Sequence, residues 1–199
     1  MALRLAFPAL ATALLLCACS GPAKSAAEPT LTVAPDPAAA AVAGNLTVEK
    51  GDVSMDGKPD VWTYYKSVQD PDDPKTTRRV AVKKEADLNF DGTKDITRIY
   101  DTDGALLQED ADLDFDGRRD EVTVYDKGVL SERRYYRSKP EVIFIQKIIK
   151  EGKMTQMNRD DNEDGRFDYC EVWYQGEKLA KRGWDKDGNG ECDYWENAE

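Results

Sequence analysis

Five nine-residue segments share the pattern Asp-x-(Asp/Asn/Ser)-x-(Asp/Asn)-Gly-x-x-Asp, and these residues have the types and spacing to do chemistry. The segments begin at Asp52, Asp87, Asp112, Asp160 and Asp185. Oxygen-bearing side chains at alternate positions, followed by a glycine that permits a sharp turn, suit a hard cation. Calcium takes about 6–8 oxygen ligands, and a loop of this spacing can wrap around one ion. The pattern therefore predicts calcium as a cofactor, with up to about five ions.

The candidate ligands lie at positions 1, 3, 5 and 9 of each loop, with a glutamate at position 12 of the last two. They are Asp52, Asp56 and Asp60; Asp87, Asn89, Asp91 and Asp95; Asp112, Asp114, Asp116 and Asp120; Asp160, Asn162, Asp164, Asp168 and Glu171; and Asp185, Asp187, Asn189, Asp193 and Glu196. The first loop has Ser54 at position 3, so we expect it to be the weakest site.

Two kinds of calcium loop share this spacing, and a third interpretation is an Asp/Gly turn without metal. An EF-hand loop has a bidentate glutamate at position 12 and a helix on each side. The last two loops have that glutamate, whereas the first three have Thr63, Arg98 and Thr123 there. The segments after the loops are rich in Val, Tyr and Trp and are poor helix formers. This favours helix-free calcium loops over EF-hand-like sites, and over Asp/Gly turns without metal.

The composition excludes several functions. The chain has 199 residues, a formal net charge of −11 and no histidine. Without histidine, a Ser-His-Asp or Cys-His catalytic set cannot form, nor can a His-ligated zinc site. An acidic chain repels the phosphate backbone, so no nucleic acid is expected as a partner.

The N-terminus reads as a targeting segment. Arg4 precedes an apolar run from Leu5 to Leu16 that is too short for a transmembrane helix of about 20 residues. The run ends in Leu-Cys-Ala-Cys-Ser, which resembles the lipobox of bacterial lipoproteins, with Cys19 as the lipidated residue. We therefore expect a signal peptide at 1–18, a lipidated Cys plus an Ala/Pro-rich linker at 19–44, and a calcium-loop β-repeat domain at 45–199. Ser20 after Cys19 favours the outer over the inner membrane, by the sorting rule of enteric bacteria.

The residues between the loops predict strands. After the last Asp of each loop, segments such as Ile96–Tyr100 and Val122–Tyr125 alternate apolar and polar residues and then reach a Gly turn. Two neighbouring pairs of loops begin 25 residues apart, which indicates a repeat architecture. The predicted fold is all-β: about a dozen strands in an antiparallel β-hairpin repeat meander, forming a curled sheet or open barrel with one buried face. Calcium loops would lie along one edge and Gly turns along the other. The run 142–149 is assigned to an extra hairpin, although a short helix is an alternative.

This domain resembles secreted lipoproteins of Gram-negative bacteria built from tandem calcium-loop and β-hairpin units. The loops are also similar to those of integrin-type propeller blades and thrombospondin type 3 repeats. The resemblance covers about residues 45–199 and implies a cell-surface or periplasmic protein that is not an enzyme.

Two further features bear on function. Cys170 and Cys192 are the cysteines of the predicted domain, and an exported protein favours a disulfide between them. Residues 133–159 are locally basic, which suggests contact with an anionic polysaccharide or other envelope proteins, unless these residues only solvate a hairpin. The sequence thus predicts a calcium-binding cell-envelope protein, anchored in the membrane by its N-terminal lipid, that is a structural or binding module. The alternatives are a calcium-dependent adhesion or assembly component, an EF-hand-like protein and, least favoured, a polysaccharide hydrolase.

Overall fold

The structure is a computed structural model, and it describes residue 38 and residues 41–198. The chain divides into the units Met1–Val33 and Ala34–Glu199, and the described residues belong to the second unit. The expected signal peptide, the lipidated Cys19 and most of the linker therefore lie outside the described residues. Within the described part, no helix has the length and apolar character needed to cross a membrane.

Twelve antiparallel strands form one sheet in which every strand pairs with its neighbours in sequence. The predicted all-β meander is confirmed, and the sheet is open and does not close into a barrel. The strands are β1 Thr47–Gly51, β2 Val61–Gln69, β3 Thr77–Ala86, β4 Ile96–Tyr100, β5 Leu106–Ala111, β6 Glu121–Asp126, β7 Val129–Tyr135, β8 Ile145–Lys150, β9 Lys153–Arg159, β10 Tyr169–Tyr174, β11 Lys178–Trp184 and β12 Tyr194–Asn197.

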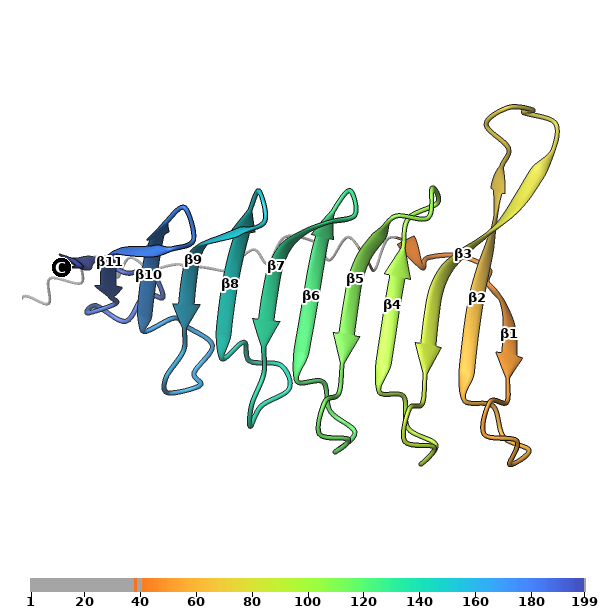
Figure 1. Cartoon of the computed structure of the whole chain (residues 1–199), viewed down its shortest axis with the longest axis horizontal. Helices are drawn as coiled ribbons and strands as arrows, with labels where there is room; N and C mark the ends of the chain where they lie inside the picture. The colour runs from red at the N-terminus through yellow and green to blue at the C-terminus, as the bar shows by residue number, and fades with distance from the viewer. Residues whose placement is uncertain (1–37, 39–40, 199) are drawn as a thin grey trace, which may run out of the picture. The chain divides into compact units, whose positions relative to one another are not determined.

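The connections alternate between two edges of the sheet, as predicted (Figure 1). One edge, here called the loop edge, is formed by one set of strand ends. It carries the connections 52–60, 87–95, 112–120, 136–144, 160–168 and 185–193. The other, the turn edge, carries the hairpin turns, such as Lys127-Gly128 and Gln175-Gly176. Both residues of each of these turns have positive φ, with values between 50° and 78°. This is the type I′ geometry that matches the twist of a two-residue hairpin.

Regular strand pairing at the loop edge contrasts with bulges near the turn edge. Each of the five hairpins closed at the turn edge has a register shift, at Tyr64/Tyr65, Ile99/Tyr100, Val124/Tyr125, Ile148/Ile149 and Val172/Trp173. The strand pairs joined by the loops have no such shift. A bulge increases the local twist of the strands, so a bulge in each hairpin twists the sheet in every repeat.

The connection 136–144 corrects one sequence prediction. The sequence predicts that the strand begins at Val142, but β8 begins at Ile145. The segment instead repeats the backbone hydrogen bonds of the acidic loops. Phe144 N donates to Tyr135 O just as Asp120 N donates to Ala111 O, both at 2.8 Å. This loop is therefore a sixth repeat without carboxylate ligands at positions 1, 3, 5 and 9, and it fills the apparent gap in the period.

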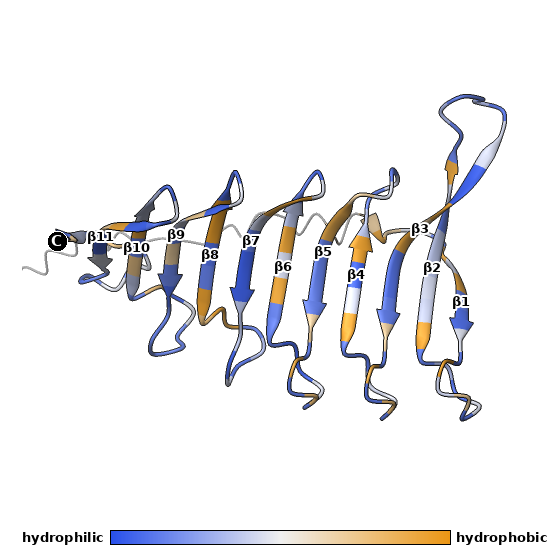
Figure 2. Cartoon of the chain, in the orientation of Figure 1, coloured by the Kyte–Doolittle hydropathy of each residue, from blue (hydrophilic) through white to orange (hydrophobic). Residues whose placement is uncertain are grey.

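The two faces of the sheet are less different than the alternation predicted. On one face Val122 pairs with Asp110 on β5 and with Arg134 on β7. The row continues through Gln146 and Asn158. The apolar pattern holds for the strands that follow loops but not for the returning strands, so the predicted face is buried in part but is of mixed polarity. The described residues form one sheet, and Figure 2 shows polar and apolar segments alternating along it.

Hydrogen-bonded side chains take the place of a continuous apolar core in the middle of that face. Gln146 donates to Glu132 at 2.7 Å, and Asn158 donates to Gln146 at 2.8 Å. Arg134 also donates to Glu132, at 2.7 Å. Burial raises the pKa of Glu132, but the hydrogen bonds from Arg134 and Gln146 outweigh it and leave this pKa below its ordinary value. This row of hydrogen-bonded side chains therefore depends on the ionised form of Glu132.

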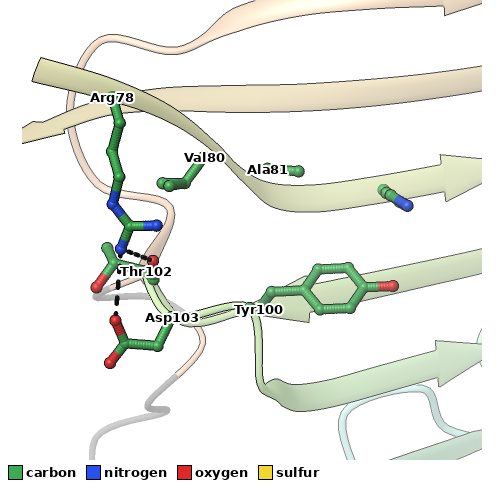
Figure 3. Close-up of a pocket in the computed structure, with 8 residues that line it drawn as sticks. Arg78, Val80, Ala81, Tyr100, Thr102 and Asp103 are labelled. Atoms are coloured by element: carbon green, nitrogen blue, oxygen red, sulfur yellow. Dashed lines mark hydrogen bonds and ion pairs between the residues drawn. The ribbon is translucent and has the colours of Figure 1, made fainter. Parts of the chain in front are cut away.

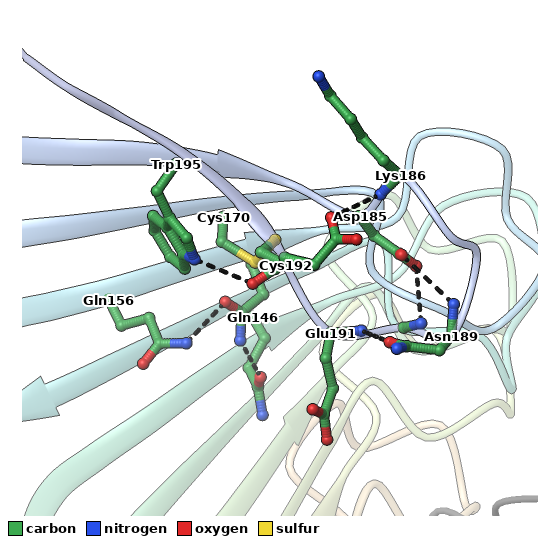
Figure 4. Close-up of a disulfide and its surroundings, with 12 residues drawn as sticks. Gln146, Gln156, Cys170, Asp185, Lys186, Asn189, Glu191, Cys192 and Trp195 are labelled. Atoms are coloured by element: carbon green, nitrogen blue, oxygen red, sulfur yellow. Dashed lines mark hydrogen bonds between the residues drawn. A yellow bond between two sulfur atoms is a disulfide. The ribbon is translucent and has the colours of Figure 1, made fainter.

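The predicted disulfide between Cys170 and Cys192 is present, with the two Cα atoms 6.3 Å apart (Figure 4). Cys170 lies on β10, opposite Gly183 on β11, and Cys192 lies in the loop 185–193. A side chain at position 183 would place its Cβ within 2.8 Å of the Trp195 ring. Trp195 Nε1 in turn donates to Cys192 O at 2.9 Å. The disulfide and Trp195 together hold the four-residue edge strand β12.

Lowering the pH should weaken the sheet partly through Glu132. A folded pKa below the ordinary 4.5 means that the carboxylate stabilises the fold at higher pH. That contribution falls as the pH drops below 4.5 through the folded pKa. Glu132→Gln should reduce the loss of melting temperature between pH 7 and pH 3, measured by circular dichroism. Glu177→Gln, at an 80% exposed side chain, is the control. An unchanged pH profile in Glu132→Gln would contradict the assignment.

Removing the disulfide should release β12 first. Cys170 and Cys192 are 22 residues apart in sequence, for which the chain-entropy account gives about 3 kcal/mol of stability. The double variant Cys170→Ser/Cys192→Ser should lose hydrogen-exchange protection in β11 and β12 while β4–β6 change less. Reductant should produce the same pattern in the unsubstituted protein and no further change in the variant. Equal protection of β12 in both proteins would show that the bond does not hold this strand.

Candidate calcium loops

The five acidic loops have one backbone conformation. Position 4 has positive φ in each, with values of 63°, 64°, 62°, 56° and 76° at Met55, Phe90, Phe115, Glu163 and Gly188. The glycine at position 6 also has positive φ, between 85° and 95°. A side chain at position 6 would be strained there. This explains why the glycine is present in all five copies.

The aspartate at position 9 closes each loop from within. Asp95 Oδ2 accepts hydrogen bonds from Leu88 N at 2.5 Å and Asn89 N at 3.3 Å. The position 9 aspartates of the first, third and fourth loops, Asp60, Asp120 and Asp168, accept the same two amide hydrogens. In the fifth loop, Asp193 accepts from Lys186 N at 3.0 Å. One oxygen of this side chain is thus used by the backbone.

The aspartate at position 1 is oriented in the same way. Asp87 Oδ2 accepts from Gly92 N at 2.7 Å. Asp52, Asp112, Asp160 and Asp185 accept from the corresponding glycine amides. At position 5, the side chains of Asp56, Asp91, Asp116, Asp164 and Asn189 accept from the amide of position 7. The backbone amides therefore fix the direction of these side chains.

The second loop contains two carboxylate oxygens that no group of the described residues satisfies. Asp87 Oδ1 and Asp95 Oδ1 are buried and have no hydrogen-bond partner within the described part of the chain. Both side chains belong to residues that are less than 5% exposed. A buried, unpaired anionic oxygen is costly, and native structures leave few such groups. A cation bound to these oxygens would remove the cost, and carboxylate oxygens are the donors that calcium prefers.

The first and third loops, but not the second, bring three carboxylates close together. Asp52, Asp56 and Asp60 have oxygens within 4.8 Å of one another, and Asp112, Asp114 and Asp116 do likewise. Like charges at this distance repel unless a cation lies among them. The acidic clusters are thus compatible with metal binding.

The amide hydrogen bonds already favour ionised loop carboxylates. The hydrogen bond from Ser54 N lowers the pKa of Asp60, and that from Thr93 N lowers the pKa of Asp91. For Asp185, burial raises the pKa, but hydrogen bonds from Gly190 and Gly188 outweigh it and lower the pKa overall. Ionised carboxylates are the form that binds a cation.

The structure places the two candidate glutamates on strands. Glu171 accepts hydrogen bonds from Tyr169 and Trp173, both at 2.9 Å, and Glu196 accepts one from Tyr194 at 2.9 Å. Each carboxylate is therefore engaged by its own strand. Asn162 and Asn189 differ, because both remain inside their loops and accept backbone amides there. Strands, not helices, flank every loop.

The loop 136–144 is braced by ion pairs in place of carboxylate ligands. Arg137 and Ser138 both hydrogen-bond to Glu163 in the next loop, at 2.8 Å and 3.0 Å. Lys139 donates to Glu163 O at 2.5 Å. The sequence pattern does not predict this loop, although the three successive loops that begin at 112, 136 and 160 are spaced 24 residues apart.

Most basic residues of the segment 133–159 have partners within the chain. Arg133, Arg134, Arg137, Lys153 and Arg159 form ion pairs with Glu121, Glu132, Glu163, Glu177 and Asp161. Lys147 lies over the Tyr135 ring, 4.8 Å from its centroid. This intramolecular pairing weakens the expectation of an anionic polymer site here.

Two of the surface hollows in the part of the chain that is described lie beside neighbouring strands and loops. One, of about 280 Å³, lies between β3 and β4 at the turn edge (Figure 3). Arg78 is held there by Thr102 O at 3.1 Å and by Asp103 at 3.5 Å. A second, of about 150 Å³, lies between the second and third loops and is lined by Asp95, Asp112 and Arg119. It adjoins the candidate calcium ligands.

Comparison with known proteins adds no family. No protein-family description matches the chain, and no curated protein matches it. One similar solved structure is that of accessory secretory protein 1, 2 and 3 of Streptococcus pneumoniae. Its sequence identity is 11% and its TM-score is 0.25, and the match covers 74% of this chain and 23% of that one. The chain therefore spans under a quarter of that protein, and the likeness carries no argument.

Replacing Asp95 by asparagine should have opposite effects with and without calcium. The amide oxygen can still accept Leu88 N and Asn89 N, while the buried charge disappears. In chelator, Asp95→Asn should be as stable as the parent or more stable, by up to about 1–3 kcal/mol. With calcium, the variant should gain less stability than the parent because one anionic ligand is lost. Thermal melts in EDTA and in calcium measure both effects.

Asp101→Asn is the matched control. Asp101 also accepts two backbone amides, from Asp103 at 2.9 Å and Ala105 at 2.8 Å, but lies at the turn edge. This variant should shift both melts equally. If Asp95→Asn lost stability equally in EDTA and in calcium, Asp95 would serve the loop only through its backbone hydrogen bonds.

Proposed function

We propose that this chain is a lipid-anchored cell-envelope protein whose repeat sheet is stabilised by calcium and acts as a structural or binding module. The observation that carries the proposal is the pair of buried oxygens Asp87 Oδ1 and Asp95 Oδ1, which have no partner within the described structure. Both belong to side chains whose other oxygen is fixed by backbone amides. The loop thus orients two anionic oxygens and leaves a cation to pair with them.

Calcium would act as a clamp between neighbouring strands. In the second loop, Asp87 follows the last residue of β3 and Asp95 precedes the first residue of β4. Asp87, Asn89, Asp91 and Asp95 would hold the ion. The same placement applies to the other four acidic loops, in which positions 1 and 9 lie at the ends of paired strands. The bound ion supplies charge neutralisation, and the chain supplies the fixed ligand directions.

The flanking strands favour this reading over an EF-hand. An EF-hand transmits calcium binding through the helices on each side of its loop. Here strands that hydrogen-bond to each other flank each loop, so binding would fix sheet geometry. A structural role for calcium follows better from this arrangement than a signalling role.

The cell-envelope assignment rests on the N-terminal sequence. Leu16, Ala18 and Cys19 match the lipobox pattern after a short apolar run. The Ala/Pro-rich linker to about residue 44 would tether the sheet to the lipid anchor. The disulfide between Cys170 and Cys192 also suits an oxidising compartment outside the cytoplasm.

Calcium should raise the melting temperature of the purified protein, and EDTA should lower it. Each site filled at about 100 times its dissociation constant adds about 2.7 kcal/mol, so even partial occupancy gives a measurable shift. Magnesium should have a smaller effect, since it demands near-octahedral geometry.

Sodium chloride of equal ionic strength is the control, because screening alone stabilises a chain of net charge −11. Equal melting temperatures in calcium, sodium chloride and EDTA would overturn the proposal.

A further inference from the structure

The first three loops expose a row of large apolar side chains that ligand binding does not require. Positions 2 and 4 of these loops are Val53, Met55, Leu88, Phe90, Leu113 and Phe115, here called the apolar row. These residues are between 46% and 89% exposed. They alternate with the candidate ligands at positions 1, 3 and 5. Exposed apolar residues gathered in one place mark interaction sites.

The apolar residues at position 4 are costly in two ways. Met55, Phe90 and Phe115 have φ values between 62° and 64°, which is unfavourable for bulky side chains. They are also exposed to water. The fifth loop has Gly188 at this position, so the loop conformation does not need a large side chain. Glu163 of the fourth loop instead pairs with Arg137. The apolar choice in the first three loops therefore calls for a partner.

Charge separates the first three loops from the last two. The loop 52–60 has three aspartates and one lysine, the loop 87–95 has three and one, and the loop 112–120 has four aspartates and two arginines. Each has a formal charge of −2, which one calcium ion cancels. The loops 160–168 and 185–193 have charges of −4 and −3 and stay acidic after binding one ion. With one calcium ion in each loop, only the three loops that carry the apolar row would have no net charge.

We propose that the apolar row, once calcium has neutralised its loops, docks onto the surface of an anionic lipid bilayer. This inference rests on the proposed function, which supplies both the calcium and the nearby membrane. The three loops with the row are those nearest in sequence to the expected lipid anchor. Lys58 stands at position 7 of the first loop and would face anionic headgroups. Lys94 and Arg118 of the next two loops form ion pairs with Glu85 and Asp116.

The spacing of the row fits a fluid surface. Successive loops are separated by two strands, or about 10 Å at a strand spacing of about 4.8 Å. The row therefore consists of three separate apolar pairs, each on a loop that is otherwise polar (Figure 2). Lipid headgroups and acyl chains can fill the gaps between such tips, and each side chain buried in the bilayer contributes to binding.

Vesicle co-sedimentation tests the inference. The probe is phosphatidylethanolamine vesicles that contain phosphatidylglycerol, and the protein is the whole mature chain with Cys19→Ser, so that no acyl chain contributes. We expect binding in calcium and none in EDTA. The triple variant Met55→Asn/Phe90→Asn/Phe115→Asn should bind at least about 10-fold more weakly. Asparagine tolerates positive φ, so this variant should keep its calcium-dependent melting temperature.

The control is Val129→Ser/Tyr174→Ser, which removes two side chains of similar exposure near the turn edge and should bind as the parent does. Equal binding in EDTA and calcium, or full binding by the triple variant, would overturn the inference. Calcium-dependent sedimentation without vesicles would also overturn it, by making a second copy the occupant. If calcium raises the melting temperature but vesicles are not bound, the inference fails and the proposed function stands. If calcium has no effect on melting, the proposed function itself fails.

Discussion

Mutual repulsion among loop carboxylates is the constraint on which this sheet depends. The loops lie at the ends of paired strands, so the same residues that repel one another also join β1 to β2, β3 to β4 and β5 to β6. Backbone amides offset part of the charge by donating to one or both carboxylate oxygens of the loop aspartates. In the second loop, Asp87 Oδ1 and Asp95 Oδ1 remain buried and have no hydrogen-bond partner among the described residues. A cation at this place would turn repulsion into a link between strands.

The sheet has little apolar core to offset a strained edge. Its buried apolar residues are few, among them Val82, Ile99 and Val122. Hydrogen-bonded strand pairs, type I′ turns and polar contacts such as Gln146 to Glu132 hold the strands together. In such an architecture each repeat contacts mainly its neighbours, so stability is a sum of local terms. The loops therefore contribute a larger share of the free energy of unfolding here than they would in a protein with a large apolar core.

The sequence predicted the features that depend on local chemistry. The Asp and Gly spacing located the five acidic loops, and alternation located β4, β6 and β10. Three features were not predicted, because they depend on strand register or on positions that carry no ligand residue. Charged residues such as Asp110 and Arg134 share a face with Val122 only once the strands pair. The loop 136–144 has no ligand residues, so only its spacing marks it. The apolar row was hidden because positions 2 and 4 look variable in the motif.

Counting the ions bound to the intact protein by native mass spectrometry tests the central claim most directly. If calcium joins the strand ends, the protein should carry up to about five calcium ions, with one fewer in Asp95→Asn. A protein that carries no calcium at concentrations well above those of the extracellular medium would contradict the account. The acidic loops would then be turns held by their own backbone hydrogen bonds.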